Sequence, residues 1–234
     1  MAANIHISLK HQSYLRDPES TELGKTIIAQ SINLLDELGF EDFTFRKLAA
    51  AIGSTEASVY RYFENKHKLL AYLVSWYWAW LDYLVTFQTH NIPDPRERMS
   101  RAIEVIVKAG QNDDPTIVYI DERVLHRVVV AESAKVHHTK EVDAENKAGY
   151  FLELKHFCHS LALLILEINP AYSYPHALVS TMLEAAHQQL FYAQHLPSLT
   201  DVKADRYNET ADFLKHIVFA VVDSKKHANP EQNG

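Results

Sequence analysis

The segment from Thr44 to Lys66, with the sequence TFRKLAAAIGSTEASVYRYFENK, carries side chains that suit contact with a nucleic acid. Thr55 and Ser58 can donate hydrogen bonds to phosphate oxygens. Arg61 can direct two parallel N–H groups at O6 and N7 of guanine, and tyrosines offer a hydroxyl for phosphate or a ring for a thymine methyl group. The surface predicted to face the nucleic acid consists of Thr55, Glu56, Ala57, Ser58, Tyr60, Arg61 and Tyr62.

Fourteen histidines raise the question of a metal site. His156 and His159 flank Cys158 on one predicted helix, and Glu122 lies one helical turn before His126. No three of these residues follow a recognised metal-ligand pattern, and a histidine pair at helical spacing is commonly incidental. We therefore predict no metal site.

Sequence motifs of common enzyme active sites do not occur in the chain. It contains no G-x-S-x-G, P-loop, H-E-x-x-H or G-x-G-x-x-G motif. The neighbouring acids Asp121 and Glu122 lie on a predicted helix, where a solvated carboxylate is more common than a catalytic one. The sequence predicts a protein that is not an enzyme and uses no cofactor.

The composition predicts an all-α fold. Six glycines and eight prolines in 234 residues are too few for the frequent turns of an all-β chain. The single cysteine cannot form an intrachain disulfide, and no secretory leader pattern begins the chain, so we expect a cytoplasmic protein. The apolar window from Leu69 to Phe87 is interrupted by Ser75, Asp82 and Thr86, which favours a buried helix over a membrane span.

The net charge of −7 argues mildly against a nucleic-acid partner, but the charge is unevenly distributed. Through residue 70 the chain has eight basic and nine acidic side chains, and the remainder has 15 basic and 21 acidic ones. The acidity therefore belongs mainly to the C-terminal two-thirds, and the total does not exclude DNA.

Turn and cap signals divide the chain into about nine helices. Early helices are expected to begin at Asp17-Pro18 and end near Gly39, to run from Thr44 to Ile52, to start at Thr55, and to cover Lys66 to Thr89. Later ones are expected from Pro95 to Gln111, from Asp113-Asp114-Pro115 through Ile117, Ile120, Val124 and Val128, from a polar stretch near His137 to Asn169, from Pro175 to Gln194, and from Val202 to Val222. This pattern predicts an N-terminal helix-turn-helix domain at 1–70 with an arm at 1–16, a larger helical domain at 71–223, and a polar tail at 224–234.

Two short helices joined at Gly53 are expected to bury the apolar residues of the Thr44–Lys66 segment, namely Leu48, Ala49, Ile52, Val59 and Phe63. A second helix of this width fits the major groove of DNA, and its N-terminal residues then meet the base edges. The alternative is a purely structural role, in which Tyr60 belongs to the core and Arg61 is a solvated surface residue. The order and spacing of the motif favour DNA binding.

The run from Ile27 to Leu70 resembles the helix-turn-helix domain of the TetR family of regulators. The matching residues are Leu34-Leu35, Gly39-Phe40, Phe43-Thr44, Arg46-Lys47-Leu48-Ala49, Gly53, Val59-Tyr60-Arg61-Tyr62-Phe63, Asn65-Lys66 and Leu69-Leu70. The resemblance implies that Thr44 and Lys66 contact phosphates and that residues 55–62 form the recognition turn and helix. Ser54 stands where an apolar residue is usual and Glu56 where a basic one is common, so DNA binding is expected to be weak or strongly salt-dependent.

The helix expected at Lys66–Thr89 is crowded with tryptophan and tyrosine, which suggests either a pocket wall or ordinary core packing. The residues predicted to line a pocket for a small apolar effector are Trp76, Trp80, Tyr83, Val124, Val128 and Phe157. Helical spacing also predicts an interface between two copies of the chain, formed by Leu178, Met182, Ala186, Leu190, Phe213, Ile217 and Val221. The alternative for these last residues is that they belong to the core of a single subunit.

Two functions follow from these patterns. The leading hypothesis is a homodimeric TetR-like repressor that binds a near-palindromic operator and is released by the effector. The alternative is a helical module that binds a small molecule or a protein and carries a weakened DNA-binding domain.

Overall fold

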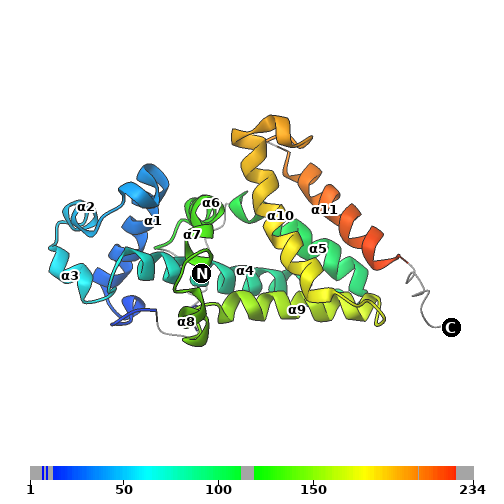
Figure 1. Ribbon diagram of the computed structural model, residues 1–234, viewed down its shortest axis with the longest axis horizontal. Coiled ribbons are helices and arrows are strands. Elements are labelled where there is room, and N and C mark those ends of the chain that lie inside the picture. Colours follow the sequence, from blue (N-terminus) through cyan, green and yellow to red (C-terminus); the bar gives the residue numbers. More distant parts are fainter. Residues whose placement is uncertain (1–6, 8, 10–12, 112–118, 205, 225–234) are drawn as a thin grey trace. The chain divides into compact units, whose positions relative to one another are not determined.

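Helices form all the regular secondary structure that the computed structural model describes, over residues 7, 9, 13–111, 119–204 and 206–224 (Figure 1). In this part of the chain the helices are α1 Glu22–Asp42, α2 Phe45–Ala51, α3 Glu56–Tyr60, α4 Lys66–Thr89, α5 Pro95–Lys108, α6 Glu122–Glu132, α7 Ala134–His137, α8 Val142–Lys147, α9 Leu152–Ile168, α10 Pro175–His195 and α11 Tyr207–Val222. Short 3-10 helices cover Pro18–Ser20 (η1), Ala109–Gln111 (η2) and Pro197–Leu199 (η3). The prediction of an all-α fold is confirmed.

The N-terminal helix begins later than the sequence pattern predicts. Asp17 caps the 3-10 helix η1, where its carboxylate accepts a hydrogen bond from the Glu19 amide at 2.9 Å. Thr21 then adopts an extended conformation and caps α1 by accepting from the Gly24 amide at 3.0 Å. The sequence pattern predicts one helix start at Asp17, whereas the structure has two, the start of η1 after Asp17 and the start of α1 after Thr21. Gly39 leaves the helical conformation with φ +71°, as expected of a glycine near a helix end.

The middle of the chain contains two short helices, α7 and α8, that the sequence pattern presented as one polar stretch. The helix α6 begins at Glu122, with the Asp121 carboxylate accepting from the amides of Arg123 and Val124. The predicted start at residues 113–115 and the predicted core residue Ile117 lie outside the described residues. Ile120 is buried, but it precedes α6 rather than belonging to it.

The last helix begins at Tyr207 rather than at Val202 as predicted. The reason is local: the Val202 amide donates to the Thr200 hydroxyl oxygen at 3.1 Å, which holds this segment in a turn.

The chain divides into two compact units. One comprises Met1–Leu84 and Lys108–Phe157, and the other comprises Val85–Val107 and Cys158–Gly234. Most of α4 belongs to the first unit, together with the predicted helix-turn-helix segment. The functional boundary near residue 70 stays a prediction.

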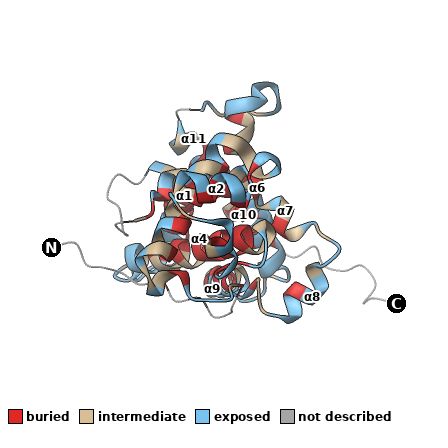
Figure 2. Cartoon of the chain, turned by 90° about the vertical axis from the view of Figure 1, so that its left-hand side faces the viewer, coloured by how far each residue is buried: buried red, intermediate tan, exposed pale blue. Residues whose placement is uncertain are grey.

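The core of the first unit is built around the aromatic helix α4, which is largely red in the burial colouring of Figure 2. Trp76, Tyr77 and Trp80 are fully buried. The Trp76 and Trp80 rings stack with centroids 6.5 Å apart and planes 16° from parallel. The Tyr77 hydroxyl lies 2.8 Å from Nδ1 of the buried His126 on α6, so the core satisfies the polar end of that tyrosine.

Polar contacts also tie the end of α1 to α6 within this unit. The Glu132 carboxylate accepts from the Phe40 amide at 2.9 Å, just after the break at Gly39. Arg127 makes a bidentate ion pair with Asp36, in which Nη2 and Nε donate to the two carboxylate oxygens at 2.6 and 3.0 Å. These contacts fix the orientation of α1, against which α2 packs, and α3 packs in turn against α2.

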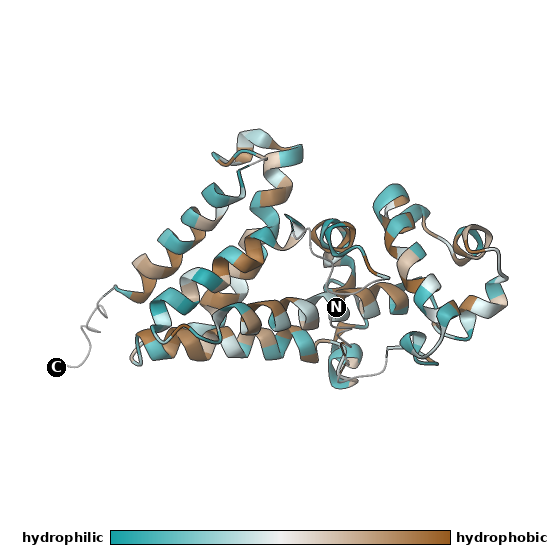
Figure 3. Cartoon of the chain, turned by 180° about the vertical axis from the view of Figure 1, so that it is seen from behind, coloured by the Kyte–Doolittle hydropathy of each residue, from teal (hydrophilic) through white to brown (hydrophobic). Residues whose placement is uncertain are grey.

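The second unit contains α10 and α11, whose hydrophilic and hydrophobic residues alternate along each helix (Figure 3). Lys215 on α11 pairs with Glu104 on α5 at 2.5 Å, and the Asn169 amide donates to the Val222 carbonyl at 2.7 Å. Among the described residues, no helix is both long enough and apolar enough to span a bilayer.

Candidate DNA-binding surface

Local capping shapes the helix-turn-helix segment as the sequence predicts. The Thr44 hydroxyl accepts from the Lys47 amide at 3.2 Å and caps α2, and the Thr55 hydroxyl accepts from the Ser58 amide at 3.3 Å and caps α3. Gly53 joins the two helices with φ +63°, a backbone conformation that favours glycine. The side chains of Leu48 and Val59, which the sequence predicts to be buried, are fully buried.

The outer side of this segment is polar and accessible. The exposed predicted residues are Thr44, Thr55, Glu56, Ala57, Tyr60 and Arg61, while Ser58 is half-buried with its hydroxyl 3.0 Å from that of Thr55. The Tyr60 side chain is 48% exposed, and its ring rests edge-on against Phe45 with centroids 5.0 Å apart. Packing against Phe45 thus holds the Tyr60 ring in place while about half of the side chain stays exposed.

Tyr62 does not lie on the outer side, and its predicted position there is wrong. The residue is 2% exposed, and its hydroxyl lies 2.7 Å from the Thr21 hydroxyl at the start of α1. The cause is that Tyr62 lies three residues after the buried Val59, a spacing that places both side chains on the inner side of the helix. The Tyr62 carbonyl instead accepts from the Leu15 amide at 2.7 Å and so holds the N-terminal arm.

Lys66 has a structural environment that the sequence pattern did not reveal. Its ammonium donates to the carbonyls of Phe40, Glu41 and Phe43 at 2.8, 2.9 and 3.3 Å, and it lies 4.5 Å from the centre of the Phe40 ring. An ammonium has three donors, and all three are engaged here. Lys66 therefore caps the carbonyl end of α1, where a positive charge is favourable, and its predicted phosphate contact stays a prediction.

We expect Lys66→Ala to lower the free energy of unfolding of the first unit by about 2 kcal/mol, because charged hydrogen bonds to three carbonyls are lost. All three tryptophans lie on α4 in this unit, so tryptophan fluorescence during urea denaturation measures the effect. Lys47→Ala is the matched control, since that ammonium makes one exposed bond, to the Asp42 carbonyl at 2.8 Å. Unchanged stability with weaker DNA binding would instead restore Lys66 as a phosphate contact.

Arg46 is a candidate that the sequence analysis named in a motif but did not assign to the surface. It is exposed on the first turn of α2, two residues after the Thr44 cap. Among the described residues, no hydrogen bond or ion pair engages the guanidinium of Arg46 or that of Arg61. In the sequence, Arg46 could have been recognised only by its position just after the Thr44 N-cap. Lys47 shares that position, and only the structure shows that the Lys47 ammonium is bonded to the Asp42 carbonyl.

Some of the residues predicted to line an effector pocket are buried in the core, and the others are partly exposed to solvent. Trp76, Trp80, Val128 and Phe157 are buried, whereas Tyr83 and Val124 are half-buried. The Trp76 indole donates to the Glu19 carboxylate of η1 at 3.1 Å. The ring of Phe157 packs against that of Trp78, with centroids 6.1 Å apart. These contacts describe core packing, and the effector pocket stays a prediction.

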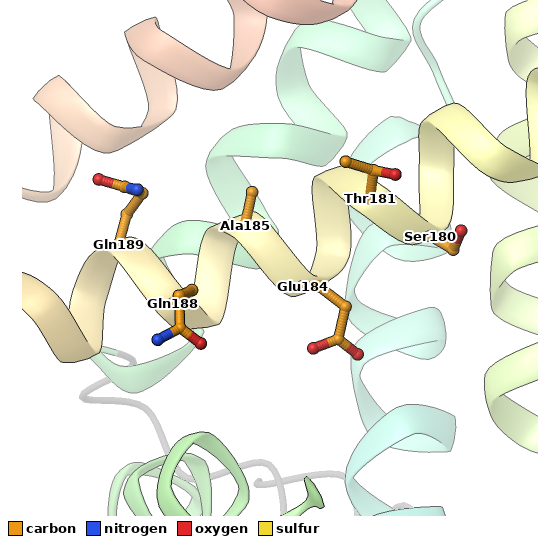
Figure 4. Close-up of a pocket in the computed structure, with 6 residues that line it drawn as sticks. All are labelled: Ser180, Thr181, Glu184, Ala185, Gln188 and Gln189. Carbon is orange, nitrogen blue, oxygen red and sulfur yellow. The ribbon is translucent and has the colours of Figure 1, made fainter. Parts of the chain in front are cut away.

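A surface hollow of about 470 Å³ lies along α10 (Figure 4). Its lining consists of Ser180, Thr181, Glu184, Ala185, Gln188 and Gln189, all from this one helix. A depression lined by one helix is open to solvent and does not enclose a small molecule as a ligand pocket does.

The residues predicted to form a dimer interface fall into two groups. Leu178, Met182, Ala186 and Leu190 on α10 are buried within the single chain. On α11, Phe213 is 41% exposed, Val221 is 37% exposed and Ile217 is half-buried. The α11 residues are thus the accessible part of the predicted interface.

Metal-binding geometry is not formed by the described side chains: no group of three or more histidine, cysteine, aspartate or glutamate residues among them is placed to hold an ion. His159 Nδ1 and His176 Nε2 lie 3.1 Å apart with their rings stacked, but these two residues alone do not make up a group of three ligands.

Comparison with known structures shows the fold. A TetR-family transcriptional regulator from Pectobacterium atrosepticum is 17% identical, with a TM-score of 0.59, over 90% of this chain and 100% of its own. AibR in complex with isovaleryl coenzyme A and operator DNA is 16% identical, with a TM-score of 0.58, over 83% of this chain and 97% of its own. The superantigen PfiT is 14% identical, with a TM-score of 0.59, over 90% and 100%. One fold therefore carries proteins described by different functions.

Comparison of sequences identifies the N-terminal domain. No curated protein matches the chain. Residues 27–73, however, match the model of the family described as bacterial regulatory proteins, tetR family. These residues run from α1 through the capped helices α2 and α3 into α4, and they include the exposed surface described above. Residues 27–73 of this chain are therefore similar to the N-terminal domain of that family of regulators.

Proposed function

We propose that the chain is a homodimeric repressor that binds a near-palindromic DNA operator and is released by a small apolar effector. The observation that carries the proposal is the exposed side of α2 and α3, where Arg46 lies beside the capped start of α2 and Arg61 lies at the end of α3, each with a guanidinium group that no other described residue engages. Arg61 follows α3 directly and suits a guanine base, whereas Arg46 suits a phosphate. The protein acts in the cytoplasm and has no catalytic role in this proposal.

Two further observations support the assembly and the effector. The exposed apolar residues of α11 recur at helical spacing, at Phe213, Ile217 and Val221, which suits packing against a second copy. The aromatic helix α4 begins directly after the DNA-reading segment, so a ligand that shifts α4 would move that segment. AibR, with a similar fold, is described in complex with both a small molecule and operator DNA.

The test separates the roles of the two arginines on duplexes selected from a random pool. Arg61→Ala is expected to cost about 1–3 kcal/mol of binding free energy and to relax the preference at one base position in each half-site. Arg46→Ala should weaken binding to all sequences alike and reduce the slope of log affinity against log salt by about one per subunit.

The control for both variants is Arg206→Ala, an exposed arginine of the second unit that pairs with Glu209 at 2.8 Å. It should leave DNA binding unchanged. Absence of any DNA binding by the unmodified protein at low salt would overturn the proposal and favour a module that binds a small molecule or a protein.

A further inference from the structure

Three basic residues begin α4 in succession, Lys66, His67 and Lys68, and the side chain of each is engaged within the chain. Lys66 holds the end of α1, as described above. His67 Nε2 lies 2.9 and 3.2 Å from the two carboxylate oxygens of Glu145, and Lys68 Nζ lies 2.9 Å from one of them. Glu145 belongs to α8, outside the predicted DNA-binding domain, and is 4% exposed. One buried carboxylate therefore engages two basic side chains at the start of α4.

The segment that carries Glu145 is fastened along α4 by two more contacts. The Lys68 ammonium lies 4.2 Å from the centre of the Tyr150 ring, and the Ser75 hydroxyl donates to the Tyr150 carbonyl at 3.0 Å. Residues 68 and 75 are about two helical turns apart and share one face of α4. Residues 145–150, with a turn at Gly149 of φ +92°, thus follow that face and set the carboxylate beside the helix start.

The Lys68 ammonium stays charged in this environment. Burial by itself lowers the pKa of Lys68, but the hydrogen bonds to Glu145 and Tyr150 outweigh it and raise the pKa above its ordinary value. The lysine is therefore a permanent cation whose donors are directed at a carboxylate. If that carboxylate moved away, the same cation would stand at the start of α4, where the helix dipole also favours a negative charge such as a phosphate.

We propose that Glu145 competes with the DNA backbone for Lys68 and His67, so that α8 holds the start of α4 in a state of reduced DNA affinity. The proposal rests on the proposed DNA-binding function and adds a regulatory contact to it. With Glu145 in place, a phosphate approaching α4 meets a Lys68 ammonium and a His67 ring that the carboxylate already engages. With α8 displaced, each subunit gains at least one further phosphate contact.

The experiment measures affinity for a duplex of arbitrary sequence as a function of salt. Glu145→Gln keeps the shape of the side chain and removes its charge. We expect it to raise affinity at low salt and to steepen the log–log salt slope by about one per subunit. The loss of affinity between about 50 and 200 mM salt then becomes about threefold larger for each subunit. The double variant E145Q/K68A should return to the slope of the unmodified protein.

Asp143→Asn is the matched control, because it removes one exposed negative charge from the same helix α8. It should leave the salt slope unchanged. Equal affinity and slope for E145Q and the unmodified protein, both folded and both bound to DNA, would overturn this inference alone. Absence of binding by both proteins would overturn the proposed function together with it.

A second measurement serves if E145Q fails to fold. Lys68→Ala in the otherwise unmodified protein should leave the salt slope unchanged, since Glu145 already occupies that cation. A slope reduced by about one per subunit would show that Lys68 contacts phosphate in the resting protein, and the inference would be wrong.

Discussion

Gly24→Ala is expected to lower the free energy of unfolding of the first unit by about 3 kcal/mol, at the upper end of the usual cost of overpacking. A Cβ atom at this position would lie 2.1 Å from the Pro18 carbonyl oxygen and 2.7 Å from its carbonyl carbon. The obstacle is backbone, so no change of side-chain rotamer relieves it. The 3-10 helix η1 would have to move away from α1, and Glu19 would lose its contacts with Tyr72 at 3.2 Å and Trp76 at 3.1 Å.

The sign of the Gly24→Ala effect makes the prediction informative, because alanine in a helix is normally favoured over glycine by about 1 kcal/mol. Urea denaturation followed by tryptophan fluorescence provides the measurement. Gly53→Ala is the comparison: that position has open space around it but a φ of +63°, so only backbone strain of about 1–2 kcal/mol is expected. A Gly24→Ala variant at least as stable as the unmodified protein would show that η1 does not pack against α1 as described.

His187 is expected to make the second unit less stable as the pH falls from neutral to mildly acidic values. Burial on α10 lowers the pKa of His187 from 6.5 to about 4. Between these two values the unfolded chain binds a proton that the folded chain excludes, so stability is full above about pH 6.5 and falls as the pH is lowered toward 4. The loss attributable to this residue is about 2 kcal/mol between pH 7.5 and 5.

The measurement compares the unmodified protein with His187→Gln by urea denaturation monitored by far-ultraviolet circular dichroism at several pH values. The variant should be less stable at neutral pH, because a buried side chain is repacked, but it should lose less stability on acidification. His216→Gln, an exposed histidine on α11, controls for the removal of any one histidine. Parallel pH curves for the unmodified protein and His187→Gln would contradict the prediction.

The parts of the fold that the sequence predicts well are those set by neighbouring residues. Thr44, Gly53 and Thr55 act through a side-chain cap or a positive φ within a few residues, and each lies where the pattern indicated. The start of α4 at Lys66 follows the same logic, with the Asn65 side chain accepting from the Lys68 amide at 2.9 Å. Cap chemistry is readable from sequence because both partners are close along the chain.

The features that the sequence leaves open depend on residues far apart along the chain. Nothing near Lys66 indicates that its ammonium meets carbonyls about 25 positions earlier, and nothing near Lys68 points to Glu145. The position of Tyr62, by contrast, could be read locally, because its spacing of three residues from the buried Val59 places it on the inner side. A pattern of apolar residues also cannot distinguish a subunit's own core from an interface with another copy, as Leu178 and Met182 illustrate.

Burial of the α10 residues within one chain has a consequence for gene control. Leu178, Met182 and Leu190 are covered without a partner, so the second unit does not need dimerisation to close its core, in contrast to an obligate dimer. Folded monomers and the proposed dimers then interconvert by mass action. When dimers are scarce, their concentration follows the square of the monomer concentration, and an about twofold rise in monomer gives an about fourfold rise in operator-bound protein. Under the proposed function, the amount of the protein in the cell then regulates operator occupancy in addition to the proposed effector.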